Sequence, residues 1–380
     1  MSCRWIAAYT ALTALLAPLT VEAQMYRVYF GTYSGKDSQG VYQATFDAAT
    51  GKLGDATLAG EAVNPSFVAI HPTGTFLYAV GEIADFEGKK TGGVTAFAID
   101  AASGKLTKLN QQSSEGTGPC HITIDKAGGT AFVANYGGGS CCSLPIGADG
   151  KLGPAASAIQ HQGSSVDEKR QTAPHAHSIN LDPSNQFAFV ADLGLDKVLI
   201  YKVDPNKHTL TPNSPPSGSV APGSGPRHFT FHPTGKTAYV INEMANTVTA
   251  FLFDAAKGSL TEIQTITTLP KDFTGTSYTA EVVAHPSGKF LYGSNRGHDS
   301  LAVFQIDAAG KLTAAGHVPT GGKTPRNFNV DPTGKWVLAG NQGTGTVTVF
   351  AVNQDTGMLT PTGQSIAVGS PVCVRFLMMK

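Results

Sequence analysis

The sequence predicts an all-β fold, a seven-bladed β-propeller, and a repeated hairpin is the main reason. A β run ends in Asp or Asn, a short polar link follows, and the pattern usually closes with Gly-Lys-Leu. This hairpin recurs at a spacing of roughly fifty residues. The copies end at Leu53, Leu106, Leu152, Leu210, Leu260, Leu312 and Leu359. A repeat of this length made only of strands is typical of one four-stranded antiparallel blade, and seven blades bury their faces in a ring.

The inner half of each repeat has a second pattern. Alternating apolar residues lead to a His or Asp, usually followed by Pro and then by Gly, which predicts a strand ending in a hairpin. The anchoring residues are His71, Asp125, Asp182, His232, His285 and Asp331. Because His and Asp alternate at a recurring turn, we expect a turn role for them and leave these His residues out of the site.

The chain ends account for a mismatch between seven hairpins and six anchors. Residues 371–376 form a lone first strand, and residues 26–31 form a second strand with no first strand before it. We therefore expect the C-terminal strand to complete the N-terminal blade, which closes the ring and leaves no open edge.

The N-terminus has the pattern of a signal peptide. Arg4 precedes an apolar stretch at 5–19, and Val21-Glu22-Ala23 offers small residues before Gln24. We expect residues 1–23 to be removed and residues 24–380 to form one exported domain, periplasmic or extracellular. The alternative is an uncleaved anchor, although the apolar stretch is short for a membrane span. Lys+Arg 27 against Asp+Glu 27 argues against a nucleic-acid or polybasic membrane surface.

Four cysteines remain after the predicted cleavage: Cys120, Cys141, Cys142 and Cys373. Export permits disulfides, but four cysteines allow three pairings and the sequence does not choose among them. We expect structural roles for them, since their spacing matches no zinc site and no catalytic cysteine signature.

Variable polar residues occur where the blades meet the channel. The start of the first strand and the end of the second strand lie at one edge of an antiparallel pair, so all blades present them around one mouth. Five residues before the anchors stand Ser66, Cys120, His177, Arg227, Ala280 and Arg326. Eleven residues after them stand Glu82, Tyr136, Leu193, Glu243, Arg296 and Gln342, with Asp192 beside Leu193 and Thr32 or Tyr33 in the split blade.

The residue types at this mouth suggest an anionic ligand. Arg outnumbers the Glu available to pair with it, and Arg binds carboxylate or phosphate in bidentate geometry. A His beside such a cluster can take a proton from water. Since Arg227 lies on the rim in this alignment, we expect it to add little packing. The alternative is a structural network of salt bridges.

Two neighbouring features complete the predicted site. One place further along the first strands stand His121, His228 and Glu281, which strand alternation would point away from the first set. The polar insert at 163–170 precedes His175 and His177 and should lie over the mouth. These two His residues could bind a metal, but the Arg residues around them argue against it, and we predict no metal and no organic cofactor.

Several motifs resemble the seven-bladed propeller lactonase family, which includes 6-phosphogluconolactonases and carboxymuconate-lactonizing cyclases. They are Pro174-His-Ala-His-Ser178, 191–198, Gly225-Pro-Arg-His228, Asn242-Glu243, 294–300 and 324–328. The resemblance covers about residues 26 to 377. It implies a funnel with His177, Arg227, Glu243 and Arg296 as the catalytic residues, which the repeat alignment also places at one mouth.

We therefore predict an exported lactone hydrolase that opens a sugar-acid or other anionic lactone. Arg227 and Arg296 would hold the anionic group and the developing oxyanion, and His177 would activate water or relay a proton with Glu243. The expected substrate-binding residues are Glu82, Tyr136, His175, Asp192, Arg326 and Gln342. A cycloisomerase and a non-catalytic binding or scaffold propeller are the alternatives. The identity of the lactone stays open, because 6-phosphogluconolactone is a cytosolic metabolite and the N-terminus of this chain has the pattern of an export signal. The sequence does not indicate the oligomeric state.

Overall fold

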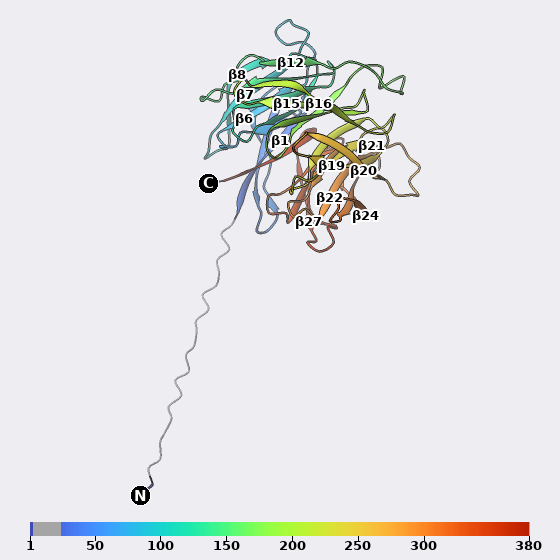
Figure 1. The fold of residues 1–380 in the computed structure, drawn as a ribbon. Helices are drawn as coiled ribbons and strands as arrows, with labels where there is room; N and C mark the ends of the chain where they lie inside the picture. Colours follow the sequence, from blue (N-terminus) through green and yellow to red (C-terminus); the bar gives the residue numbers. More distant parts are fainter. Residues whose placement is uncertain (3–23, 380) are drawn as a thin grey trace.

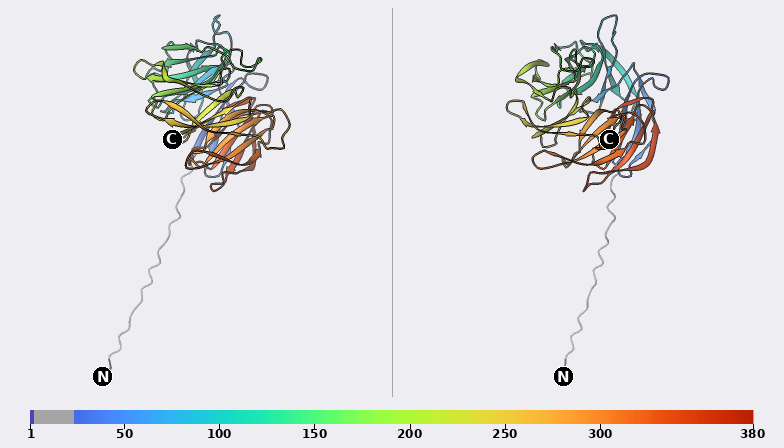
Figure 2. Two further views of the ribbon diagram at one scale, coloured as in Figure 1. Left: turned by 45° about the vertical axis from the view of Figure 1, so that its right-hand side comes forward. Right: turned by 90° about the vertical axis from the view of Figure 1, so that its right-hand side faces the viewer.

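The computed structural model describes residues 1–2 and 24–379, so the predicted signal peptide lies almost wholly outside the described residues. Seven antiparallel sheets form a ring, which Figure 1 and the right-hand view of Figure 2 show from different sides. The predicted seven-bladed β-propeller is confirmed. Within the described residues, no helix has the length and apolar character needed to cross a membrane.

The strands follow the chain from blade to blade, and each later blade runs from the channel outward. The first three blades contain β1 (Met25–Thr32), β2 (Gly40–Asp47), β3 (Lys52–Leu53) and β4 (Thr57–Glu61); β5 (Val68–Ile70), β6 (Phe76–Gly81), β7 (Gly93–Ile99) and β8 (Leu106–Ser113); β9 (Pro119–Ile124), β10 (Thr130–Asn135), β11 (Ser140–Pro145) and β12 (Ser157–Gln160).

The fourth and fifth blades contain β13 (Ala176–Leu181), β14 (Phe187–Asp192), β15 (Lys197–Asp204) and β16 (Thr209–Ser219); β17 (Pro226–Phe231), β18 (Thr237–Asn242), β19 (Thr247–Asp254) and β20 (Ser259–Thr267). The sixth and seventh contain β21 (Tyr278–Ala284), β22 (Phe290–Arg296), β23 (Ser300–Ile306) and β24 (Leu312–Pro319); β25 (Pro325–Val330), β26 (Trp336–Asn341), β27 (Thr346–Val352) and β28 (Leu359–Ala367).

The two chain ends share the first blade, as the sequence predicts. The last strand, β29 (Pro371–Met378), pairs antiparallel with β1 from Tyr26 opposite Met378 to Thr32 opposite Pro371. Figure 2 shows these blue and red strands together at the closing seam. Closure satisfies the backbone groups that an open first blade would expose at its inner edge.

The residue pattern of each strand matches its depth in a blade. The second strands β10 and β14 are buried at every position, because a neighbouring blade covers each of their faces. The outer strand β28 alternates between exposed and partly buried positions, as a strand with one solvated face does. Apolar clusters accordingly lie between consecutive blades. One of them contains side chains from both ends of the chain, among them Tyr29 and Cys373.

The recurring turn residues join each blade to the next. His71, His232 and His285 each bond a hydroxyl of their own turn through Nδ1, and each contacts a glycine carbonyl of the following turn through Nε2. The expected turn role is therefore confirmed. A second link was not predicted: the hydroxyls of Tyr29, Tyr78, Tyr239 and Tyr292 donate to the glycine carbonyl of the next blade's outer hairpin.

The four cysteines of the described chain are free and buried. Cys141 and Cys142 are neighbours on β11 and face opposite sides of the blade, where each joins a different apolar cluster. This placement agrees with a packing role for both side chains.

Candidate active site

Bulges in the first strands position the polar side chains at the channel mouth. In the fourth blade Ala176 pairs with Asp192 and Ser178 pairs with Ala191, so His177 is an extra residue in the ladder. The same register shift leaves out Cys120 in β9, Arg227 in β17, Arg326 in β25 and Val372 in β29. A bulge bends its strand and re-aims a side chain. Four of the first-strand positions that the repeat alignment selects are therefore bulged ones.

The bulges also correct one expectation. Strand alternation would point His228 away from Arg227, but the pairing skips from Pro226 to His228 and the alternation is interrupted. His228 consequently lines the same small void as Arg227 and His177. Two successive residues of β17 thus face the channel.

The rim residues enclose a pocket of about 310 Å³. Its lining consists of Glu82, Cys120, Tyr136, Arg170, His177, Glu243, Tyr278, Arg296 and Arg326. A much smaller void of about 10 Å³ adjoins it and shares Glu82, Cys120, His177 and Arg326 with it. The pocket therefore has an open part and a narrow recess.

Glu243 organises one half of the pocket through three arginines. Its Oε1 contacts Arg170 Nη2 at 2.8 Å, and its Oε2 contacts Arg227 Nε at 3.0 Å and Arg296 Nη2 at 2.8 Å. Arg227 also donates from Nη1 to the carbonyl of Ala280 at 2.7 Å. This set of ion pairs resembles the structural salt-bridge network that the sequence analysis gave as an alternative. Both carboxylate oxygens of Glu243 are in contact with an arginine.

The arginines determine the protonation state of Glu243. Burial alone raises the pKa of this carboxyl, but Arg296, Arg227 and Arg170 outweigh burial and lower the pKa to about 2. Opposite charges within a few ångströms favour the ionised form. Glu243 is consequently a carboxylate at neutral pH and a weak proton acceptor.

The other half of the pocket is built around Arg326. Its Nη2 donates to the Tyr33 hydroxyl at 3.2 Å, and its guanidinium lies 5.5 Å from the centre of the Tyr33 ring. Tyr33 donates in turn to Glu82 Oε2 at 2.9 Å, and Ser66 donates to the same oxygen at 2.5 Å. Among the described residues, Arg326 forms no ion pair with a carboxylate, so its charge is available to a ligand.

His177 lies where these two halves meet. The side chain is buried, its Nδ1 is 3.7 Å from Cys120 Sγ, and its ring packs edge-on against Tyr136 and His228. Burial, and after it the positive charge of Arg227, hold the pKa of His177 well below its ordinary value. The imidazole is neutral at pH 7 and can accept a proton.

Comparison with known proteins places this chain in a family. The family model described as the seven-bladed β-propeller lactonase matches residues 27–376. The chain is 38% identical to the 6-phosphogluconolactonase of Bacillus subtilis over 350 residues, 92% of this chain and 97% of the relative. The chain belongs to the lactonase family.

Further relatives agree with this assignment. The 6-phosphogluconolactonase of Formosa agariphila is 35% identical over 90% of this chain and 96% of its own. The structure of the Pseudomonas aeruginosa periplasmic gluconolactonase superposes with a TM-score of 0.88 at 32% identity, covering 94% of this chain and all of the other. The resemblance noted in the sequence motifs is confirmed.

Most of the predicted site residues come together in this pocket. His177, Glu243, Arg296, Glu82, Tyr136 and Arg326 line the pocket itself, and Arg227 lines the adjoining recess. Arg227 is only 2% exposed and is among the largest fully buried side chains, so the expectation that it adds little packing is wrong. Its position in a bulge, and not on an open rim, is the reason.

Three predicted substrate-binding residues lie outside this pocket. Asp192 is fully buried, its Oδ1 accepts the backbone N–H of His175 and Gly194, and its Oδ2 bonds His161. Asp192 thus fixes the loop before His177. His175 stacks behind the Tyr136 ring at 4.6 Å.

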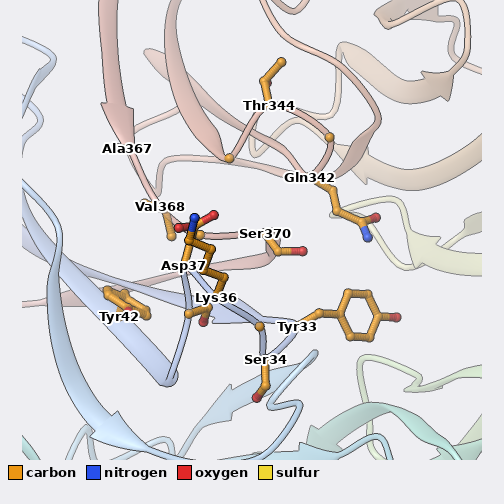
Figure 3. A pocket seen from close by; sticks show the side chains of 15 residues that line it. Tyr33, Ser34, Lys36, Asp37, Tyr42, Gln342, Thr344, Ala367, Val368 and Ser370 are labelled. Atoms are coloured by element: carbon orange, nitrogen blue, oxygen red, sulfur yellow. The ribbon is translucent and has the colours of Figure 1, made fainter.

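Gln342 is the third, and it lines a separate pocket of about 660 Å³ at the closing seam. This pocket lies between the loop after β1, the turn between β26 and β27, and the segment after β28. Figure 3 shows Gln342 and the Tyr33 ring on one side of it and Tyr42 on the other. Tyr33 lines both this pocket and the recess, so Gln342 is a neighbour of the site and not part of its wall.

Arg170 and Tyr278 were not among the predicted site residues. Arg170 ends the polar insert that was expected over the mouth, and its contact with Glu243 shows that the insert does reach it. Tyr278 is the first residue of β21, just before the register shift of that strand. It does not stand at either of the two positions that the repeat alignment compares. Among the described residues, no three His, Cys, Asp or Glu side chains gather as metal ligands would.

Proposed function

We propose that this lactonase-family protein hydrolyses a lactone of a sugar acid or another anionic lactone. One observation carries the proposal: the pocket combines a neutral imidazole, His177, with a guanidinium, Arg326, that no described carboxylate neutralises. Ester hydrolysis needs a proton acceptor for water, and an anionic lactone needs a positive charge that holds its anionic group. The relatives named 6-phosphogluconolactonase support this reaction class.

The contacts favour Arg326 as the group that holds negative charge. Among the described residues Arg326 forms no ion pair, whereas Arg296, which we also expected to hold the anion, is paired with Glu243 at 2.8 Å. Arg227, which we expected to hold the anion, instead spends Nε on Glu243 and Nη1 on the Ala280 carbonyl. We assign Arg227 to supporting Glu243.

Proton transfer is assigned to His177. In the proposed reaction its neutral imidazole takes a proton from water as the water oxygen attacks the lactone carbonyl. The expected relay through Glu243 is disfavoured, because a carboxylate whose pKa is about 2 holds a proton poorly at neutral pH. Glu243 would instead fix the arginines in place before the substrate arrives.

The pocket size narrows the substrate class. A volume of about 310 Å³ is at the lower end of the range for small-molecule sites, which suits a single-ring lactone. The substrate would therefore be a monosaccharide-derived lactone, with or without a phosphate group.

A lactone panel with product analysis tests the proposal. Glucono-1,5-lactone, 6-phosphogluconolactone and carboxymuconolactone would be incubated in ¹⁸O-labelled water, with the rate of spontaneous opening subtracted. We expect enzyme-dependent formation of hydroxy acid with one ¹⁸O in the carboxylate. Isomerisation without label would indicate a cycloisomerase, and no reaction with any lactone would indicate a binding propeller; either result would overturn the proposal.

Export is a separate proposal. We infer that residues 1–23 are a cleaved signal peptide, on the residue pattern and on the similarity to the Pseudomonas aeruginosa periplasmic gluconolactonase. N-terminal sequencing of the native protein should find a start near Gln24. A membrane-bound product with residues 1–23 intact would favour the anchor.

A further inference from the structure

A histidine and a glutamate form a buried pair beside the recess. His228 Nδ1 and Glu281 Oε1 are 2.8 Å apart, and the side chains come from the first strands of neighbouring blades. Both are nearly inaccessible, with His228 4% and Glu281 6% exposed. The assignments above give neither residue a role.

Fixed donors determine how this pair is oriented. The Oδ1 of Asn327 accepts the backbone N–H of Val374 at 2.8 Å, so its Nδ2 must donate, and it does so to Glu281 Oε2. The backbone N–H of Val282 donates to Glu281 Oε1 at 2.9 Å. With donors on both oxygens, Glu281 is held as an acceptor, and His228 donates its Nδ1 proton to it. The lone pair of His228 is then on Nε2.

The recess adjoins this imidazole. His228 lines it together with His177 and Ser66, and among the described residues only its Nδ1 is hydrogen-bonded. The volume of about 10 Å³ is about the smallest that accepts one water molecule, and its lining offers several polar partners. The two imidazole rings lie 5.4 Å apart between centroids, and both line the recess, so one water molecule there would have both rings as neighbours.

A second buried pair in the same protein shows what is particular about the first. His161 Nδ1 and Asp192 Oδ2 are 2.6 Å apart and both side chains are fully inaccessible. The Nε2 of His161 is buried without a partner among the described residues, and His161 lines neither the pocket nor the recess. A histidine–carboxylate pair alone is thus a packing feature in this fold; the recess beside His228 makes the difference.

We propose that Glu281 and His228 form a proton relay behind His177, with one water in the recess bridging the two imidazoles. The proposal rests on lactone hydrolysis as the reaction. As the attacking water bonds to the carbonyl carbon, its proton passes to His177 and through the bridging water to Nε2 of His228. When the bond from the carbonyl carbon to the ring oxygen breaks, the proton returns to that oxygen. Water is consumed, a hydroxy acid forms, and the relay regains its starting state.

The surroundings suit a base that is neutral at rest. The charged and titratable groups around His228 are Arg227, Arg375, Arg326, Arg296, Glu281, His121 and His177. Burial, followed by the charge of Arg227, holds the pKa of His228 well below its ordinary value. Burial raises the pKa of Glu281, and the positive charge of Arg375 opposes that rise. In the proposed relay the ionised Glu281, in contact with the ring, stabilises the imidazolium when the proton arrives.

The test compares Glu281→Gln, His228→Gln and the control His161→Gln on the lactone that the parent hydrolyses best. General acid–base groups contribute at least about a hundredfold, so kcat should fall by roughly 10²-fold in the first two variants with little change in KM. Because the groups act as a unit, adding His228→Gln to His177→Gln should cost little more than His177→Gln alone. In the pH profile of kcat, the acid limb should move to lower pH in Glu281→Gln, because the imidazolium loses its anion and the pKa of the imidazole falls. The acid limb should stay in place in His161→Gln.

A second measurement does not depend on turnover. Nδ1 protons of histidines bonded to carboxylates give separate downfield proton resonances, and Glu281→Gln should remove one and leave the resonance of His161. Parent-like kcat and an unmoved acid limb in a folded Glu281→Gln would overturn the relay while leaving lactone hydrolysis intact. If the parent opens no lactone, the proposed function fails and the relay fails with it.

Discussion

The two halves of the pocket use arginine in opposite ways. On one side, three arginines surround Glu243, and both oxygens of that carboxylate are paired with them. On the other side, Arg326 has Tyr33 as its one hydrogen-bond partner among the described residues and also lies against the Tyr33 ring. Glu82 accepts hydrogen bonds from two hydroxyls in place of a cation. The three arginines of the first half thus share Glu243 as a partner, whereas Arg326 in the second half has no carboxylate partner among the described residues.

This difference separates scaffold from recognition within one site. Buried ion pairs recover the cost of desolvation only when their geometry is fully satisfied, so the Glu243 half is intolerant of change. An arginine without an anionic partner has charge left to offer, so the Arg326 half should bind the ligand. A count of charged residues at the mouth does not reveal this division; only the pairing does.

The largest expected effect is that of Glu243→Gln. Removing this carboxylate leaves Arg170, Arg227 and Arg296 without their common anion, and breaking a buried pair costs about 3–5 kcal/mol. We expect a folded fraction and a melting temperature clearly below those of Glu82→Gln, the matched change in the other half. Equal melting temperatures for the two variants would contradict the distinction.

The pH dependence of stability should report the same carboxylate. The pKa of Glu243 is about 2 in the folded chain and returns to its ordinary value on unfolding. A depressed folded pKa stabilises the protein above the unfolded pKa, and that stability is lost as pH falls from about 4.5 towards 2. Denaturant titrations should show this acid loss in the parent and a smaller one in Glu243→Gln. Parallel curves would mean that other carboxyls dominate.

Arg227→Ala should come next in size and should affect the fold. The side chain is 2% exposed and bonds both Glu243 and the Ala280 carbonyl, so its removal empties a buried volume and takes one of three arginines from Glu243. We expect a loss of about 3 kcal/mol in unfolding free energy, against less than about 1 kcal/mol for Arg170→Ala, whose side chain is 37% exposed. Chemical denaturation of both variants measures the difference.

The repeat predicted the fold because it records local structure that every blade must have. Hairpin residues, alternating strands and the closing strand at 371–376 all follow from spacing and turn chemistry. The bulges are a different matter. No residue type marks the extra position at His177 or Arg227, so their burial and the inward turn of His228 appear only in the strand register.

The site was predictable in position and less so in pairing. A fixed offset from the turn placed His177, Glu243 and Arg296 together, since one sheet edge gathers those positions. Whether an arginine there is free or paired depends on side-chain reach across blades, which spacing does not encode. Asp192 illustrates the limit: it stands one place before the site offset and was expected to bind substrate, but its carboxylate turns towards His161.

Arg326→Ala should change substrate recognition and spare the fold. The side chain pairs with no described carboxylate, so no buried anion is left behind. Losing one charge-assisted contact costs about 1.5–3 kcal/mol, or roughly 10- to 100-fold in KM for an anionic lactone. A neutral lactone of the same ring size should be affected less. Equal losses for both lactones, measured as kcat/KM, would remove Arg326 from anion binding.

Tyr33→Phe should have the smallest effect and sharpen the comparison most. The hydroxyl links Arg326 at 3.2 Å to Glu82 at 2.9 Å, so it holds the unpaired arginine at a fixed distance from the nearest carboxylate in its half. Removing it costs about 1 kcal/mol, several-fold in kcat/KM, while the ring and its contact with the guanidinium remain. If the hydroxyl mainly positions Arg326, the loss should disappear in the Arg326→Ala background, because a linker has no effect once its partner is gone. If the loss persists there, Tyr33 contacts the substrate itself, and the open half of the pocket has two ligand-binding groups instead of one.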